Sequence, residues 1–197
     1  MTQSPIDLEA LRRGDPLALD AFYRQHARKV LGWAIRLGGP SVDPEDITHE
    51  VFAIAFRKLR GFRGDAQPST WLFVITRNVV SNARRRAAIR RFVGLDSGMD
   101  ELPSEEPGAD ADIEGKRRRR QVQLALERLK APQREVLVLM DLEGRTAPEV
   151  AEMLDVPAGT VYSRLHYARK AFKQALERSG ITSWDTAGAA LRTGGDV

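Results

Sequence analysis

Residues 146–173, TAPEVAEMLDVPAGTVYSRLHYARKAFK, restrict the fold more than any other stretch, because they predict two short helices joined by a tight turn. Val150 and Leu154 lie four residues apart, as one face of a first helix requires. Pro157 breaks this period, since proline disfavours helix in the residue before it and suits a helix start. The second helix then has apolar residues at helical spacing: Val161, Leu165, Ala168 and Phe172. The stretch therefore predicts a helical hairpin with one buried face on each helix.

The opposite face of the second helix is polar and cationic. Its residues are Thr160, Ser163, Arg164, Tyr167 and Lys170. Such side chains suit the major groove of DNA, where base edges offer hydrogen-bond donors and acceptors and phosphates flank both sides. An ordinary helical hairpin with a solvated basic face has the same pattern, so both interpretations stay open on this segment alone.

Composition excludes several classes of protein. The 197 residues, 42% of them hydrophobic, allow one sizeable core or two small ones, and no apolar run predicts a membrane span. The N-terminus lacks the apolar core of a signal peptide, so we expect a cytoplasmic location. The chain has no cysteine, which excludes disulfides and thiolate zinc sites, and its three histidines fall on separate segments. We therefore expect no metal or other cofactor.

The net charge of +4 conceals three blocks of different sign. Residues 1–91 hold 16 Lys/Arg and 9 Asp/Glu, residues 92–115 hold 8 acids and no base, and residues 116–179 hold 14 bases and 8 acids. The acidic block is too polar to pack and predicts a flexible linker between two domains. When extended it reaches roughly 80 Å, so the two domains could bind separate sites on one DNA. We expect the tail, 180–197, to be largely disordered.

Helix signals run through both basic blocks. Asp15-Pro16 and Asp43-Pro44 each combine a helix cap with a proline suited to the first turn. Gly38-Gly39-Pro40 ends the first of these helices. A Gly- and Pro-containing loop follows the second and precedes a third, from Ser69 to about Arg91. With two more helices expected before the hairpin, the predicted fold class is all-α, with two small helical domains.

The second predicted helix carries four acids: Asp43, Glu45, Asp46 and Glu50. Asp46 and His49 have the spacing of metal ligands, but a metal site in a helical bundle needs matching carboxylates from other helices, and no second Glu-x-x-His pair exists. Helix capping explains Asp43 and Glu45 but not Glu50. A surface for a basic protein partner, with Phe52 as an apolar anchor, explains the rest. We favour capping and partner binding together.

The third predicted helix has two different faces. The apolar face consists of Leu72, Ile75, Val79 and Ala83. The other face consists of Trp71, Asn78, Asn82 and Arg85, joined by Arg77, Arg84 and Arg86. A tryptophan at the start of a basic, amide-bearing helix can stack on an unpaired base. A core tryptophan followed by solvated arginines fits equally well, and both interpretations stay open.

Two stretches resemble a known family. DPEDITHEVFAIAFRKLRGFRGDAQPSTWLFVITRNVVSNARRR resembles region two of bacterial sigma factors of the extracytoplasmic-function group, and LKAPQREVLVLMDLEGRTAPEVAEMLDVPAGTVYSRLHYARKAF resembles region four. With GDPLALDAFYRQHARKVLGWAIRLGG upstream, the resemblance covers roughly residues 14–178. It implies a non-enzymatic subunit that binds RNA polymerase core, directs it to promoter DNA and helps to melt the minus-ten region.

The resemblance also assigns roles to residues. Those that dock on the clamp helices of the polymerase core are Asp43, Asp46, Glu50 and Phe52. Those that read or hold the minus-ten element, with loop 62–69 helping to capture a flipped base, are Trp71, Arg77, Asn78, Asn82, Arg84 and Arg85. Those that address the minus-thirty-five element are Thr160, Tyr162, Ser163, Arg164, His166, Tyr167 and Arg169. An anti-sigma protein is a further candidate partner.

Three residues depart from the family pattern. His49 replaces a usual glutamine, and Tyr162 and Tyr167 replace common Lys or Arg, so we do not expect the consensus minus-thirty-five specificity. Two other functions compete with this reading. A self-sufficient helix-turn-helix regulator needs neither the acidic helix nor the Trp71 face and usually dimerises on palindromic sites. A nuclease or recombinase needs clustered carboxylates or a nucleophile context that the sequence lacks.

Overall fold

A computed structural model describes residues 7–62, 64, 66–94 and 110–179, with the backbone alone for 110–114. The regular structure in these ranges is helical: α1 (Leu8–Arg13), α2 (Pro16–Gly38), α3 (Pro44–Lys58), η1 (Leu59–Gly61), α4 (Pro68–Phe92), α5 (Asp110–Glu127), α6 (Ala131–Leu137), η2 (Val138–Leu142), α7 (Ala147–Leu154) and α8 (Ala158–Arg178). The predicted all-α class is confirmed. No helix in these ranges is long and apolar enough to cross a membrane. Most of the predicted linker and the whole predicted disordered tail, 180–197, lie outside the described residues.

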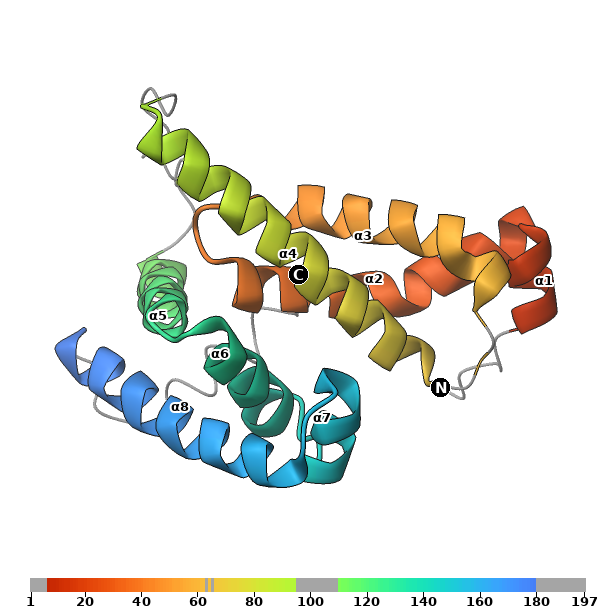
Figure 1. The fold of residues 1–197 in the computed structure, drawn as a ribbon. Helices are drawn as coiled ribbons and strands as arrows, with labels where there is room; N and C mark the ends of the chain where they lie inside the picture. The colour runs from red at the N-terminus through yellow and green to blue at the C-terminus, as the bar shows by residue number, and fades with distance from the viewer. Residues whose placement is uncertain (1–6, 63, 65, 95–109, 180–197) are drawn as a thin grey trace.

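Helices α1 to α4 form the first bundle, in which α2, α3 and α4 pack on one another (Figure 1). Asp15 caps α2 by accepting a hydrogen bond from the Ala18 N–H at 2.9 Å, and a proline follows it at the helix start. Asp43 caps α3 in the same way. At the centre of the bundle, Trp33 of α2 meets Phe73 of α4 edge to face, with ring centroids 5.2 Å apart. Both predicted cap positions are therefore real.

Helix α1 has no counterpart among the predicted elements. Asp7 caps it, and Gly14 ends it with φ 78°, a left-handed conformation that favours glycine. It packs through the buried Leu11, and Arg12 donates two hydrogen bonds to the Phe62 carbonyl at 3.0 and 2.8 Å. Six residues are too few to show a helical period, so only the cap and the glycine mark this helix in the sequence.

Helices α5 to α8 form the second bundle. Each apolar position expected on the second helix of the predicted hairpin, which is α8, is buried: Val161, Leu165, Ala168 and Phe172. The segment after α6 widens into the π-helical η2, which the sequence does not predict. Helix α5 begins at Asp110, so the last six residues of the predicted linker are helical rather than extended.

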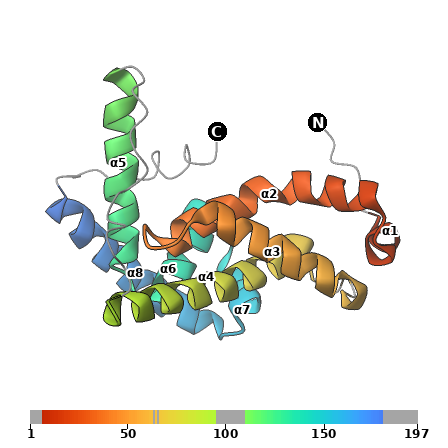
Figure 2. The ribbon, with the colours of Figure 1, turned by 90° about the horizontal axis from the view of Figure 1, so that it is seen from above.

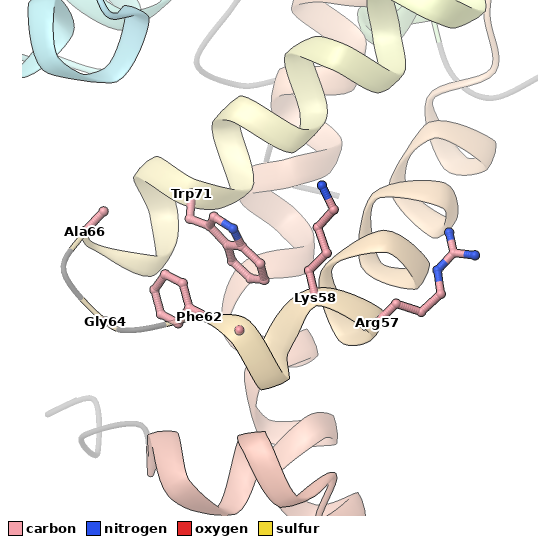
Figure 3. Close-up of a pocket in the computed structure, with 7 residues that line it drawn as sticks. Arg57, Lys58, Phe62, Gly64, Ala66 and Trp71 are labelled. Carbon is pink, nitrogen blue, oxygen red and sulfur yellow. The ribbon is translucent and has the colours of Figure 1, made fainter.

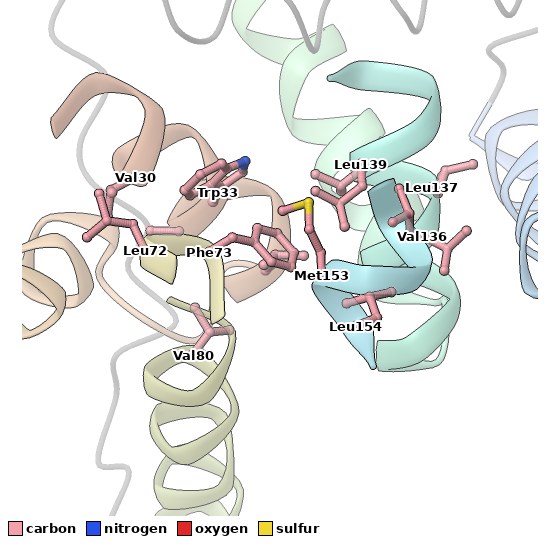
Figure 4. Close-up of a cluster of buried hydrophobic side chains, with 14 of the residues drawn as sticks. Val30, Trp33, Leu72, Phe73, Val80, Val136, Leu137, Leu139, Met153 and Leu154 are labelled. Atoms are coloured by element: carbon pink, nitrogen blue, oxygen red, sulfur yellow. The ribbon is translucent and has the colours of Figure 1, made fainter. Parts of the chain in front are cut away.

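The two bundles are in direct contact. Helix α5 runs past the C-terminal end of α2, and α7 lies against α4 (Figures 1 and 2). Phe73 of α4 and Met153 of α7 point toward each other across the boundary (Figure 4). Thr76 and Val80, which lie outside the predicted apolar face of α4, are also buried. Helix α4 is therefore buried on more than one side, and the buried side chains of both bundles form one cluster.

One testable consequence concerns the start of α7. The Glu149 carboxylate accepts hydrogen bonds from the Thr146 N–H and hydroxyl, both at 2.8 Å, and from Arg145 at 3.1 Å. The Thr146 N–H, then its hydroxyl, then Arg145 lower the pKa of Glu149 below its ordinary 4.5. A lowered folded-state pKa gives stability that is present above the ordinary pKa and lost as pH falls through the folded value.

Glu149→Gln should therefore lower the melting temperature at pH 7, and the gap from wild type should close as pH falls below 4.5. Glu177→Gln is the matched control, because Glu177 is exposed and lies 4.0 Å from Lys173 of the same helix, α8. Thermal melts by circular dichroism between pH 7 and pH 3 measure the gap. A gap that stays constant across this range contradicts the role of the ionised carboxylate.

Candidate nucleic-acid and partner interfaces

The outer side of α8 carries most of the residues predicted to address the minus-thirty-five element. Tyr162 and Tyr167 are 58% and 59% exposed, which is unusual for large aromatic side chains of a helix that is buried on its other side. Ser163 and His166 are exposed beside them, and Thr160 and Arg164 are half-buried. The predicted face thus exists as one surface.

Arg169, the last residue of this predicted set, is held in an ion pair. Its Nε and Nη2 donate to both carboxylate oxygens of Asp141, at 2.9 and 2.6 Å. The hydrogen bonds to Asp141 raise the pKa of Arg169. Such a bidentate pair fixes the plane of the guanidinium. Asp141 lies 28 residues earlier, on η2, and helical periodicity gives no sign of the pairing.

Helix α4 divides the residues predicted for the minus-ten element into two groups. Asn78, Asn82 and Arg85 are exposed. Arg77 and Arg84 instead pair with carboxylates of the second bundle. Arg77 lies 3.9 Å from Glu135, and Arg84 lies 3.6 Å from Glu127 and donates to the Gly38 carbonyl at 2.6 Å.

Trp71 lies in a cationic hollow at the start of α4. The indole is half-buried and stacks on the Phe62 ring, with centroids 4.7 Å apart and planes inclined by 30° (Figure 3). The hollow measures about 560 Å³ and is also lined by Arg57 and Lys58 from the end of α3. Trp71 is therefore neither a pure core residue nor a free surface ring.

Three acids of the predicted polymerase-binding set lie exposed on α3. Asp43 also accepts hydrogen bonds from the N–H groups of the first turn, as expected of a cap. Asp46 is exposed, and Glu50 pairs with Arg86 of α4 at 3.2 Å. Among the described residues, no group of three potential ligands is placed to hold a metal ion. Asp46 and His49 therefore have no third ligand beside them in this part of the chain.

Phe52, the fourth member of that set, is a core residue, which corrects the predicted role as a surface anchor. Only 3% of it is exposed. Its ring packs against Tyr23 at 4.7 Å, Phe56 at 5.7 Å and Phe22 at 6.4 Å between centroids. The Phe52 ring thus closes onto α2 and is not available to a partner.

Comparison with known proteins decides the family. Residues 22–90 match the family "Sigma-70 region 2", and residues 119–172 match "Sigma-70, region 4". The chain is 31% identical over 163 residues to the ECF RNA polymerase sigma factor SigL of Mycobacterium tuberculosis, covering 82% of this chain and 90% of that protein. The chain belongs to the extracytoplasmic-function sigma factors.

Other relatives agree. The sigma factor is 34% identical over 171 residues to SigE of Mycolicibacterium smegmatis, covering 84% of this chain and 65% of that protein. It is 31% identical over 178 residues to the sigma-E factor of Escherichia coli, covering 86% and 92%. Its fold is similar to CnrH in a complex with the cytosolic domain of CnrY, with a TM-score of 0.61, 23% identity and coverage of 87% and 95%.

The family settles the class of function. Sigma factors are non-enzymatic initiation subunits that bind RNA polymerase core and promoter DNA. The predicted sigma-factor function is therefore confirmed, and the self-sufficient regulator is not favoured. The roles of individual residues stay predictions.

The burial of Phe52 can be tested, because a core residue and a surface anchor for the polymerase respond differently to substitution. Phe52→Ala should cost about 3–5 kcal/mol of unfolding free energy, because it leaves a cavity among three aromatic rings. Phe52→Leu refills most of that space and should cost less than about 1.5 kcal/mol. Denaturant unfolding gives both values, and a titration with polymerase core should show wild-type affinity for Phe52→Leu. Weaker core binding by a fully folded Phe52→Leu contradicts the correction.

Proposed function

We propose that this sigma factor divides its work among three helices, with α3 docking on the polymerase core, α4 holding the minus-ten strand and α8 reading the minus-thirty-five duplex. The observation that carries this assignment is the α4 surface, where an exposed row of amides and arginine begins at an aromatic hollow with a cationic rim. A helix that only supports a core has no use for such a row.

The hollow at Trp71 suits an unpaired base. Aromatic faces stack on any base, and nearby cations hold the backbone phosphates of a single strand. Lys58 lies beside the indole, and Phe62 covers one part of it (Figure 3). We infer that a base leaving the melted duplex enters this hollow, with Asn78 and Asn82 further along α4 offering hydrogen bonds to the next bases.

The α8 surface suits duplex DNA of unusual sequence. Tyr162 and Tyr167 stand where cationic side chains are common in the family, so this face offers hydroxyl groups and aromatic rings in place of charge. Fewer phosphate contacts mean a weaker salt dependence of binding. Arg164 and Lys170 supply cations on this face, whereas Arg169 is paired with Asp141. We infer that Arg164 contacts a phosphate, with Ser163 and His166 nearer the bases.

The acidic α3 surface suits a basic protein partner, because complementary charge steers encounter and fixes register. We infer that Asp46 and Glu50 meet the clamp helices of the core, and that the protein acts in the cytoplasm, where the polymerase works. An anti-sigma protein stays a predicted partner of this chain.

The first test concerns the core. The double charge reversal Asp46→Lys with Glu50→Lys should weaken binding to polymerase core at least tenfold, because two favourable charge contacts become repulsive. The control, Asp20→Lys with Glu177→Lys, makes the same change in charge at two exposed acids of α2 and α8. A fluorescence titration of each full-length variant with core compares them. Equal affinities of the two variants for polymerase core contradict the role of α3 in docking.

The second test separates melting from docking. Trp71→Ala should keep core affinity but reduce open-complex formation by about 5- to 150-fold, since stacking on one base is worth ~1–3 kcal/mol. Trp71→Phe keeps a ring in the hollow and should recover part of the loss. Permanganate reactivity of thymines in the melted region is the readout. If Trp71→Phe and Trp71→Ala, both folded, open promoters as well as wild type, the hollow does not hold a base.

A further inference from the structure

One carboxylate beside the α8 surface belongs to none of the predicted contact sets. Asp141 lies on η2, the π-helical segment that follows α6, and only 10% of its side chain is exposed. Val138 and Leu139, which precede it on η2, are buried in the core. A π-helical turn holds more residues than an α-helical one, and such turns occur frequently at functional sites. A segment fixed by the core therefore carries Asp141 to the flank of α8.

Asp141 uses both carboxylate oxygens to hold one arginine of α8. Arg169 donates to them through Nε at 2.9 Å and through Nη2 at 2.6 Å, and 55% of its side chain is exposed. An arginine has five N–H donors, so three are left, two of them on Nη1. In the described part of the chain no other group accepts a hydrogen bond from this guanidinium. The pair therefore has oriented donors to offer to a partner molecule.

These donors lie on the same side of α8 as two residues predicted to address the minus-thirty-five element. Tyr162, His166 and Arg169 follow one another at intervals of four and three residues, which places them along one face of a helix. All three are exposed. From Tyr162 to Arg169 the helix rises about 10 Å, at about 1.5 Å per residue. A duplex that contacts Tyr162 and His166 is therefore within reach of the guanidinium.

The charge of Asp141 changes what Arg169 can offer to DNA. An unpaired arginine is a mobile cation that binds phosphates of any sequence and releases their counterions. The bidentate pair carries no net charge, and the Asp141 carboxylate repels an approaching phosphate. The remaining N–H groups still donate to an acceptor that lies in the plane of the guanidinium, such as a guanine edge or one phosphate oxygen in the right register. The strength of binding then depends on position more than on charge.

We propose that Asp141 is a positioning residue for minus-thirty-five recognition, which orients Arg169 toward one acceptor on the preferred duplex and weakens its binding to other sequences. This inference rests on the proposed role of α8. Asp141 acts through Arg169, and the repulsion that it adds against wrongly placed phosphates is a contribution that specific interfaces use. A pair that only joins η2 to α8 contributes to stability but has no effect on sequence preference or on salt dependence.

Holoenzyme assembled from the full chain and polymerase core provides the test, with randomised duplex DNA as the probe. Wild-type holoenzyme first selects a preferred duplex from the pool. Fluorescence anisotropy at several salt concentrations then gives the affinity for this duplex and for the unselected pool. Asp141→Asn keeps the shape of the side chain but removes its charge, so Arg169 becomes a free cation. We expect the salt slope to increase by about one unit. The preference for the selected duplex should fall about fivefold or more, the lower end of what one directed base contact contributes.

Asp20→Asn is the matched control, because Asp20 pairs with the Nε of Arg24 at 2.9 Å on α2. It removes the same charge from the same kind of pair in the other domain, and it should match wild type in both quantities. Adding Asp141→Asn to Arg169→Ala should also change neither quantity, because the carboxylate then has no arginine to orient. If the full effect of Asp141→Asn persists in the Arg169→Ala background, Asp141 does not act through Arg169 and the inference is overturned.

Substitutions of two neighbouring cations test the inference without altering Asp141. Arg169→Ala should lower the preference for the selected duplex and leave the salt slope near its wild-type value, since the pair is neutral. Lys170 is exposed and forms no ion pair within the described ranges. Lys170→Ala should therefore lower the salt slope by about one unit and leave the preference unchanged. Equal losses of salt slope in the two variants contradict a neutral pair and overturn the inference.

Tyr162→Ala with Ser163→Ala separates failure of this inference from failure of the proposed role of α8. If this variant binds the selected duplex as tightly as wild type, α8 does not read the duplex and both proposals fail. If it binds more weakly while Asp141→Asn keeps the wild-type slope and preference, the role of α8 stands and the inference fails. Circular-dichroism melts of the free chains show whether each variant is folded.

Discussion

A single buried guanidinium ties the two domains of this sigma factor together. Arg134 is 3% exposed and donates to the carbonyls of Leu126, Glu127 and Leu129 at the end of α5, and to that of Leu37 at the end of α2. Burial, followed by the charge of Arg84, lowers its pKa to about 10, so the group stays protonated at neutral pH. Backbone carbonyls at the C-terminal ends of α5 and α2 thus bind one positive charge. The negative end of each helix dipole stabilises a cation at this place.

This arrangement makes the domain contact both specific and reversible. A buried cation needs all its hydrogen bonds, because a charge left without partners costs several kcal/mol. Three of the Arg134 bonds lie within region four and persist whether or not the domains touch. Only the bond to Leu37 crosses the boundary, where water or another acceptor can replace it. Weaker contacts around it also hold the two domains together. They are made by Gln123, by Glu143 and by Phe73 with Met153.

Local chemistry made much of the fold predictable. The Asp-Pro pairs that open α2 and α3, the glycines that end α2 and the apolar period of α8 each act within a few residues, and each predicts its helix correctly. Helix α1 is too short, at six residues, to show a helical period in the sequence, and the π-helical turn at η2 has no sequence signal of its own. The burial of Phe52 does not follow from the sequence, because an apolar side chain beside acidic residues on a helix has the same pattern whether it meets a partner or its own bundle.

The contact between the domains is the feature that the sequence predicts least, for a physical reason. An acidic linker that reaches roughly 80 Å indicates independent domains. The composition of a linker sets how far apart two domains can lie, but it does not show whether they pack on each other. Arg134 and Gln123 are polar residues on helices, Glu143 follows one, and all three resemble ordinary solvated positions. Across the domain boundary, their partners lie about ninety or more positions away in the sequence. No local sequence pattern connects residues so far apart. The exposed faces of α3 and α8, by contrast, follow directly from helical spacing.

Small-angle X-ray scattering of the free full-length chain tests the packed arrangement most directly. A compact chain of this length has a radius of gyration of about 16 Å. We expect a value within a few ångströms of this and a pair-distance distribution with a single maximum. A radius above about 25 Å with two maxima, as two domains on an extended linker give, contradicts the account.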